Sequence, residues 1–432
     1  MFHLPWEDQD GALSPKADWR DASDEWLRFQ TEIIKRLGEA GPSGRATPDA
    51  TDYYGRADFR RVAFPSIFDF SVFESPLHAT FEDASFGQIH GFSNASFGGL
   101  TSFRRATFRE GVIFANARFG EEDVYVSFTI FKGAAMFEGA SFMNEVHFSD
   151  ATFSGSANFD DAKFGDQASF NGAKFLGEAT FSVRDVDKAN TKFQRINFSK
   201  AEFHGPCSFE NRNFTANASF NDAEFHDLVK FHGCTFHQGM SFHDTKFYKT
   251  HGGYDAEGFE NDAETEKLER SYRTLKLGME TLRARNEEAM FFAKEMECRR
   301  NRSDIGLFEH FVAFSYEKLS NYGQSILKPL VWLTGFTALM WCVYYVTGEK
   351  TLTDLVLDVI SGKVESWEIA KFTIGQMFRP FFVWSATSGD KAIDLVRYNP
   401  FLIPLLASLQ SLATLSLLAL FLLALRRRFK MD

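Results

Sequence analysis

Phenylalanine recurs every five or six residues between positions 59 and 247. The two steps alternate, so the repeating unit is eleven residues long and reads F-x-x-A-x-F plus five more residues. An amphipathic helix spaces its apolar residues by about 3.6 positions and a half-buried strand by 2, so neither explains the pattern. An eleven-residue period also suits a supercoiled helix, but Gly and β-branched residues throughout the unit argue against one. The fixed long period predicts a solenoid.

The alternating steps predict a square coil with four sides and about 22 residues per turn. Each side offers the axis one large ring and one small residue, which together fill a narrow core without voids. The strand spacing of about 4.8 Å sets the rise per coil. Phenylalanines 22 positions apart then stack. The predicted core contains Phe81, Phe86, Phe92, Phe97, Phe103, Phe108, Phe198, Phe203, Phe220, Phe225, Phe242 and Phe247.

This pattern resembles the pentapeptide-repeat family in its Phe-centred form, in which a small residue stands two positions before a central Leu or Phe. Ala84 before Phe86 is one instance among many across residues 55–249. The resemblance implies a β-solenoid of the right-handed quadrilateral β-helix type. The chain departs from a strict five-residue repeat by one extra residue in every second side. It slips out of phase near residues 120–126 and 183–193, where we expect a loop or bulge.

Helices are expected on both sides of the solenoid. Residues 1–54 form a polar segment without the pattern of a secretory signal, and an amphipathic helix over residues 23–37 would cap the open first coil. Residues 250–306 predict a linker and one long charged helix, from about residue 264 to 302, that would dock on the last coil.

Two uncharged apolar stretches follow, over residues 329–347 and 399–425. Each is long enough to cross a bilayer core of about 30 Å, and both are predicted to be transmembrane helices. An amphipathic juxtamembrane helix is predicted over residues 307–328, before the first stretch. The alternative, two buried core helices, is weaker because little of the chain remains to surround them.

Positive charge sets the expected orientation. The basic tail at residues 426–432 and the lysines before the first span, Lys318 and Lys328, favour cytoplasmic positions for both termini. Residues 348–398 would then face the other side of the membrane. Within them, residues 367–384 suit either a re-entrant pore helix or an interfacial helix.

The C-terminal part also has a resemblance. FFAKEMECRR at residues 291–300 and NYGQS at residues 321–325, ahead of two spans, resemble the tail of membrane-bound bacterial pentapeptide-repeat proteins. This implies the inner membrane of a bacterium. Relatives with a similar layout sometimes resemble two-helix ion channels, but the Thr-x-Gly-Tyr-Gly filter of potassium channels is absent here.

Charge and cysteine content exclude some classes. The net charge of -11 argues against general nucleic-acid binding. Some pentapeptide-repeat proteins mimic DNA with an acidic face and bind topoisomerase, but Arg and Lys are mixed into this repeat. Four scattered cysteines indicate reduced, structural thiols. No Walker, G-x-S-x-G, H-E-x-x-H or paired C-x-x-C motif occurs, so neither an enzyme nor a cofactor is expected.

Two groups of polar residues remain as candidates for function. His204 and His226 are 22 positions apart and would stack on an outer face, where they are weak candidates for a metal or pH-sensing site or simply solvated side chains. In the second span, hydroxyl side chains recur every three residues beside a glutamine. Three alternatives are open for them: they line a pore, they form a helix contact, or they are hydroxyls that lipid tolerates. These residues are Ser408, Gln410, Ser411 and Thr414.

The sequence thus predicts a membrane-anchored cytoplasmic β-solenoid that acts as a scaffold for an unknown protein partner. We expect a homo-oligomer, with the polar stripe of the second span at a subunit interface or around a central pore. One alternative is an oligomeric channel-like effector in which the solenoid senses or assembles. A second alternative is a DNA mimic, which the mixed surface charge disfavours.

Overall fold

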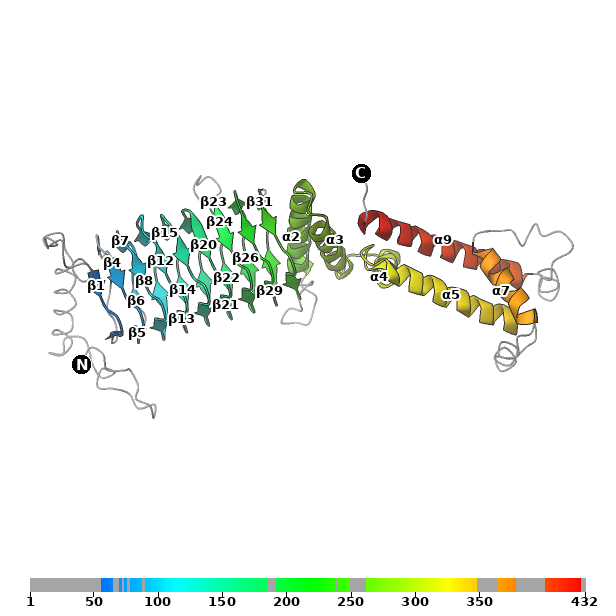
Figure 1. The fold of residues 1–432 in the computed structure, drawn as a ribbon, viewed down its shortest axis with the longest axis horizontal. Helices are drawn as coiled ribbons and strands as arrows, with labels where there is room; N and C mark the ends of the chain where they lie inside the picture. The colour runs from blue at the N-terminus through cyan, green and yellow to red at the C-terminus, as the bar shows by residue number, and fades with distance from the viewer. Residues whose placement is uncertain are drawn as a thin grey trace, which may run out of the picture. The chain divides into compact units, whose positions relative to one another are not determined.

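The computed structural model describes residues 56–64, 70–71, 74–75, 78–87, 90–184, 192–237, 239–248, 262–347, 364–377 and 401–428. The chain divides into two compact units, Met1–Ser303 and Asp304–Asp432. The first contains a β-solenoid and a helix pair, and the second contains four helices among its described residues (Figure 1). The capping helix expected over residues 23–37 lies outside the described residues.

The solenoid has four faces made of short parallel strands. The first face contains β1 (Arg56–Asp58), β4 (His78–Thr80), β8 (Thr101–Ser102), β12 (Val124–Tyr125), β16 (Val146–His147), β20 (Gln167–Ser169), β24 (Arg195–Asn197), β28 (Ala218–Ser219) and β32 (Met240–Ser241). The second contains β2 (Ala63–Phe64), β5 (Ser85–Phe86), β9 (Thr107–Phe108), β13 (Ile130–Phe131), β17 (Thr152–Phe153), β21 (Lys174–Phe175), β25 (Glu202–Phe203), β29 (Glu224–Phe225) and β33 (Lys246–Phe247).

The other two faces are shorter or divided. The third contains β6 (His90–Gly91), β10 (Val112–Ile113), β14 (Ala135–Met136), β18 (Ala157–Asn158), β22 (Ala179–Thr180), β26 (Cys207–Ser208) and β30 (Val229–Lys230). The fourth contains β3 (Glu74–Ser75), β7 (Ser96–Phe97), β11 (Arg118–Phe119), β15 (Ser141–Phe142) and β19 (Lys163–Phe164), then a separate sheet of β23 (Lys192–Phe193), β27 (Asn213–Phe214) and β31 (Thr235–Phe236). The predicted β-solenoid is confirmed.

Stacked phenylalanine rings fill the axis of the coil. The rings of Phe81 and Phe103 are 4.7 Å apart and 4° from parallel, and those of Phe203 and Phe225 are 4.8 Å apart. The predicted stack of Phe198 on Phe220 and of Phe220 on Phe242 is also present. Every phenylalanine of the predicted core is buried. The spacing of the rings therefore matches the strand spacing of about 4.8 Å, so each coil forms strand hydrogen bonds and ring contacts with the next coil at the same rise.

Alternate corners of the coil hold one residue in the left-handed conformation, directly before the small residue. Asp83 and Asn94, before Ala84 and Ala95, have φ values of 57° and 59°. Asn and Asp adopt this conformation more readily than other residues with a Cβ. The corner positions are therefore selected for backbone shape as well as for contact with water. They include Asp83, Asn94, Asn116, Asp150, Asp161, Asn211, Asp222 and Asp244.

Both expected slips change the register of the coils. Thr101 pairs with Val124, one position beyond the regular period, so the corner over residues 120–123 absorbs the extra residue. Lys174 pairs with Glu202, and the coil between them is longer again. Most of this second insertion, residues 185–191, lies outside the described residues. The fourth face is divided at the same place, between β19 and β23.

Arg212 takes the place of a small residue beside this division. Its guanidinium is fully buried and donates to the backbone carbonyl oxygens of Phe159 and Ala162, both at 2.9 Å, and of Phe181. It also lies 4.6 Å from the centre of the Phe193 ring. Burial lowers the pKa of the Arg212 side chain to about 10, so it stays charged at neutral pH. The arginine thus donates to three backbone carbonyl groups inside the coil.

Helices cover the last coil, as predicted, but the prediction of one long helix is wrong, because two shorter helices form this cover. α2 (Asp262–Thr281) and α3 (Arg285–Arg300) are separated by a turn in which Arg283 has φ 57°. The turn brings Phe291 of α3 beside Tyr272 of α2, and both rings contact Phe247. One straight helix would cross the flat end of the coil over a short length only. Two adjacent helices bury more of it.

Charge and close packing hold the pair in place. Glu295 of α3 is buried and forms ion pairs with Arg273 at 2.7 Å and Lys276 at 2.6 Å, both from α2. Gly278 of α2 lies against Phe236, where a Cβ atom would come within 2.3 Å of the ring. Only glycine therefore permits this approach of α2 to the coil.

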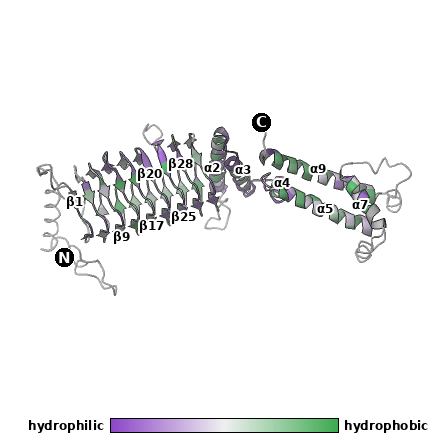
Figure 2. Ribbon diagram, viewed as in Figure 1, coloured by the Kyte–Doolittle hydropathy of each residue, from purple (hydrophilic) through white to green (hydrophobic). Residues whose placement is uncertain are grey.

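The second unit contains α4 (Leu307–Ser320), α5 (Leu327–Val346), α7 (Val364–Gln376) and α9 (Leu402–Arg428). Asn321, Tyr322 and Gly323 all have positive φ values and turn the chain from α4 into α5. The amphipathic helix predicted over residues 307–328 therefore ends at Ser320. α5 and α9 are hydrophobic along most of their length (Figure 2). By length and composition alone, Leu327–Val346 and Leu402–Arg426 qualify as candidate membrane spans.

The stacked core predicts a large difference between neighbouring residues. Phe108 is buried and stacks on Phe86 at 4.4 Å and on Phe131 at 5.2 Å, whereas Arg109 is partly exposed. Phe108→Ala should lower the free energy of unfolding by about 3–5 kcal/mol, because it removes buried surface and leaves a cavity. Arg109→Ala should cost less than about 0.5 kcal/mol. Thermal unfolding of residues 1–303 measures both, and equal losses would refute the inward and outward assignments.

Candidate functional site

A buried polar seam joins three helices of the second unit. Gln410 of α9 is fully buried, accepts a hydrogen bond from the hydroxyl of Tyr344 in α5 at 2.8 Å, and donates to the C=O of Thr373 in α7 at 2.9 Å. The ring of Tyr344 packs edge-on against Phe372. Because both ends of the amide are paired, the glutamine fixes the relative positions of α5, α7 and α9.

Two hydroxyls of α9 continue the seam. Ser411 donates to the C=O of Gln376, and Thr414 donates to the C=O of Met377 at 2.8 Å. These carbonyls stand at the end of α7, where a helix lacks partners for its last C=O groups. Ser408, the fourth residue of the predicted stripe, is half-buried and donates to the C=O of Pro404 in its own helix.

The stripe therefore serves a contact within one chain. A helix contact is one of the roles that the sequence leaves open for these residues, and the structure shows such a contact with α7. Their position at a subunit interface or around a central pore stays a prediction. α7 covers the first part of residues 367–384 and packs on both apolar helices; the rest of that segment lies outside the described residues.

The two candidate histidines lie on the second face of the solenoid. His204 and His226 stack with ring centres 4.6 Å apart and planes 2° from parallel, as predicted, and Tyr248 stacks next at 4.6 Å. Parallel rings direct their nitrogen lone pairs alongside each other, which does not suit one shared ion.

The same histidines have carboxylate partners. His204 pairs with Glu202 at 3.2 Å, and His226 pairs with Glu224 at 3.3 Å. Each carboxylate also binds a lysine ammonium, Lys174 at 3.0 Å and Lys246 at 2.6 Å respectively, and these hydrogen bonds lower the pKa of Glu202 and of Glu224. This ladder is neutralised by its own side chains and gives no support to a metal site.

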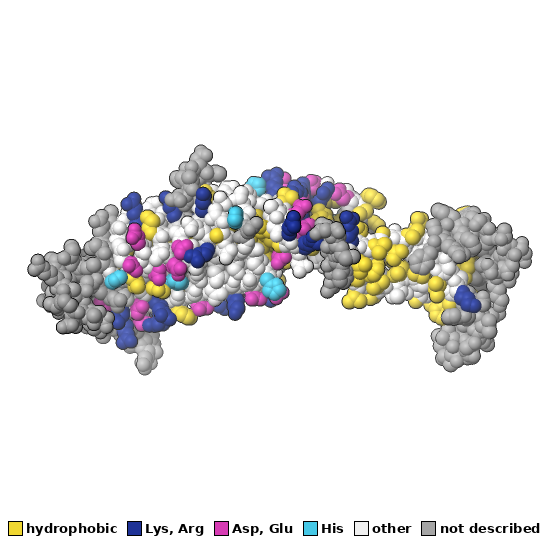
Figure 3. All heavy atoms as spheres, turned by 45° about the horizontal axis from the view of Figure 1, so that its top comes forward, with side chains coloured by type: hydrophobic (Ala, Val, Ile, Leu, Met, Phe, Trp, Pro, Cys, Tyr) yellow, Lys and Arg dark blue, Asp and Glu magenta, His cyan; other side chains and the backbone are white. Residues whose placement is uncertain are grey.

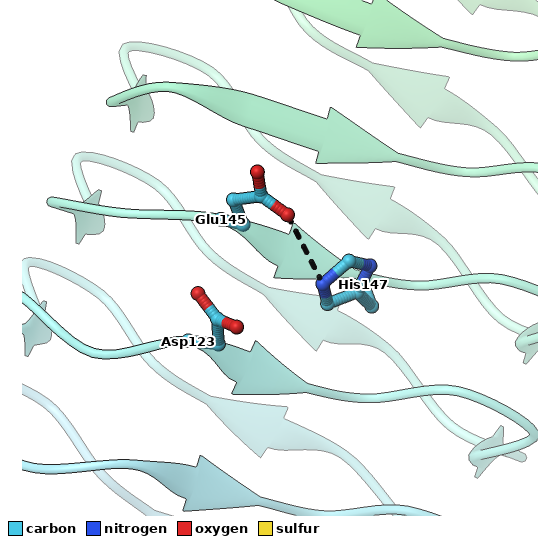
Figure 4. A group of neighbouring side chains, drawn as sticks. All are labelled: Asp123, Glu145 and His147. Atoms are coloured by element: carbon cyan, nitrogen blue, oxygen red, sulfur yellow. Dashed lines mark ion pairs between the residues drawn. The ribbon is translucent and has the colours of Figure 1, made fainter.

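A different cluster, on the first face, was missed from the sequence. Asp123 and Glu145 stand directly before β12 and β16, and His147 is in β16 (Figure 4). Their potential ligand atoms all lie within 4.8 Å of one another, and all three side chains are half-buried. In the sequence, Asp123 and Glu145 are one period of the coil apart. The cluster nevertheless combines three residue types, and the repeat reveals only positions that hold the same type.

Comparison with protein families agrees with the coiled geometry of the solenoid. Residues 92–141, 137–182 and 189–235 match the family model described as pentapeptide repeats (9 copies). The β-solenoid is built from pentapeptide repeats. No curated protein and no solved structure matches the chain. The family match covers coils of the solenoid and none of the helices.

The seam predicts which serine of α9 tolerates replacement. Ser411→Leu should lower the midpoint of thermal unfolding of the full-length protein in detergent, because leucine loses the bond to α7 and overfills a buried site, at a cost of about 1–3 kcal/mol. Ser416 is exposed, and its hydroxyl donates to Leu412 within α9, so Ser416→Leu is the matched control and should leave the midpoint unchanged. Equal effects would contradict the seam.

Proposed function

We propose that this pentapeptide-repeat protein is a membrane-anchored scaffold, in which α5 and α9 cross the bilayer and the β-solenoid offers its faces to a protein partner. One observation supports this above all: large apolar side chains of both helices are exposed. They are Leu327, Val331, Trp332, Leu339, Val346, Leu402, Leu405, Leu409, Leu412, Leu415, Leu422 and Leu423. Exposed apolar surface on this scale marks a lipid or protein contact.

The low burial of the two helices argues against their being core helices of a soluble domain. In the most apolar window of each, 22% and 28% of the residues are buried. A core helix would be mostly buried. Figure 3 shows hydrophobic side chains gathered on the helical unit and charged side chains spread over the solenoid. A lipid phase around α5 and α9 explains this division.

α4 suits the surface of the same membrane. Leu307, Phe308 and Phe311 are 92%, 80% and 65% exposed, and they lie on the helix that leads into α5. The indole N–H of Trp332 donates to the C=O of Lys318 at 3.3 Å and links the start of α5 to α4. Apolar side chains beside lysine and an indole are typical of a helix in the interfacial region.

The polar seam is compatible with a position inside a bilayer. Polar side chains in a span face protein rather than lipid. Gln410, Ser411 and Thr414 face α5 and α7 and bond there, so they stabilise the packing of helices within one chain. A pore is not required to explain these residues, which favours the anchor over the channel-like alternative. A homo-oligomer remains part of the proposal.

The side chains on the solvent-exposed faces of the solenoid favour a protein partner. Acidic residues there pair with basic ones one coil away, as in Asp83 with Arg105 at 2.7 Å. DNA mimicry needs a continuous acidic surface, and these pairs interrupt it. A stacked array with flat faces gives a rigid display surface, which is how repeat proteins bind. We propose no catalytic role and no nucleic-acid partner.

Membrane topology tests the proposal. Basic residues Lys318, Lys328 and Arg426 favour cytoplasmic ends for both spans. The protein should stay in the membrane fraction after a carbonate wash. Reporters fused at residues 1 and 432 should indicate the cytoplasm, and an insertion near Gly362 the other side. Recovery of the protein in the soluble fraction, or labelling of position 362 only after the membrane is broken, would contradict the two-span anchor.

A further inference from the structure

The cluster of Asp123, Glu145 and His147 has a geometry fixed by the coil. Val124 pairs with Val146, so the residues before them, Asp123 and Glu145, occupy equivalent places on neighbouring coils. Glu145 and His147 flank the buried Val146 and point to the same outer side of the strand, and all three side chains of the cluster converge there (Figure 4). The stacked core holds their backbones in place.

The charge of this cluster is not neutralised as it is elsewhere on the solenoid. Several other carboxylates of the described coils bind a lysine or arginine of another coil, as in Asp83–Arg105, Asp160–Arg184, Asp166–Arg195, Glu202–Lys174 and Glu224–Lys246. In contrast, Asp123 accepts hydrogen bonds from the neutral Asn144 at 3.0 Å and Tyr125 at 3.1 Å. Glu145 lies 3.7 Å from the ring nitrogen of His147.

Among the described residues, no basic side chain stands next to the two acids in their own column of the face. After Glu145 come Gln167 and then Arg195, which is two coils away, pairs with Asp166 and attracts Glu145 only over this longer distance. Two carboxylates one coil apart repel each other, and a bound cation relieves that repulsion.

The donor atoms indicate the class of cation. Two carboxylates and one imidazole suit a divalent transition-metal ion such as Zn²⁺ or Mn²⁺, whereas Ca²⁺ and Mg²⁺ prefer oxygen ligands alone. Donors bound at about 2.0–2.2 Å around a tetrahedral ion lie about 3.3–3.6 Å apart. The separations of up to 4.8 Å are thus closed by small side-chain rotations.

Neighbouring residues support the ligands. Tyr125 stacks on the His147 ring at 5.0 Å and 11°, and its hydroxyl orients the carboxylate of Asp123 together with Asn144. Such outer contacts fix ligand orientation in metal sites. We propose that Asp123, Glu145 and His147 bind one divalent transition-metal ion on the first face, with the remaining positions open to water or to a donor from a partner.

Isothermal titration calorimetry with ZnCl₂ and with MnCl₂ tests the site on the full-length protein in detergent, after chelator treatment. The tested chain carries Cys342→Ser, because Cys342 is the one cysteine that is not buried and a thiolate is itself a zinc ligand. One ion should bind per chain, and Glu145→Gln or His147→Ala should weaken binding at least tenfold. His204→Ala is the matched control, because that histidine stacks in the neutralised ladder, and it should bind as the parent does. Parent binding no stronger than that of His147→Ala would overturn the proposal.

Thermal unfolding separates a lost site from a lost fold. Without metal, Glu145→Gln should unfold at the same temperature as the parent or higher, because the exchange keeps the shape and removes like-charge repulsion. With Zn²⁺ the parent midpoint should rise and that of Glu145→Gln should not. A lower midpoint of the variant in chelator, or an equal rise of both with Zn²⁺, would count against the site.

Discussion

The stacking of phenylalanine on phenylalanine from coil to coil is the interaction on which the structure depends. Parallel strands fix the rise of a coil, and the centres of stacked rings such as Phe153 and Phe175 are 4.8 Å apart. One sequence period therefore satisfies ring contact and strand pairing together. Alanine beside the rings and Asn or Asp at the corners follow from this, because the coil has little room inside and needs left-handed residues where it turns.

The same constraint decides what happens outside the coil. Residues one coil apart become neighbours at strand spacing, so side chains distant in sequence form columns on each wet face. Several acids in the described columns meet a base, which neutralises them. Asp123 next to Glu145 departs from that arrangement, and the departure makes this position chemically distinct. A rigid solenoid can thus carry a local site without any loop to build it.

The sequence predicts the solenoid well because its signal is periodic and repeats over many coils. Phase alone was enough to pair Phe198 with Phe220 and to locate both insertions. It could not predict the turn at Arg283, which depends on how the flat coil end is covered, or the carbonyl bonds of Arg212, which exist only where the fourth face is divided. The candidate sites were harder to predict for a similar reason. Spacing identified Ser411 and Thr414 as one face of a helix, but their partner α7 came from a segment without a clear pattern of its own. Asp123 and His147 differ in type, so only the structure brought them together.

Disulfide cross-linking tests the coil register most directly. Lys174 pairs with Glu202 across the second insertion, whereas Thr180 stands one regular sequence period before Glu202 but belongs to the third face. Paired residues on neighbouring strands lie within the Cα range of a disulfide. Under mild oxidation of the full-length protein, Lys174→Cys with Glu202→Cys should cross-link, and Thr180→Cys with Glu202→Cys should not. Cross-linking of the second pair in place of the first would contradict the stacking described here.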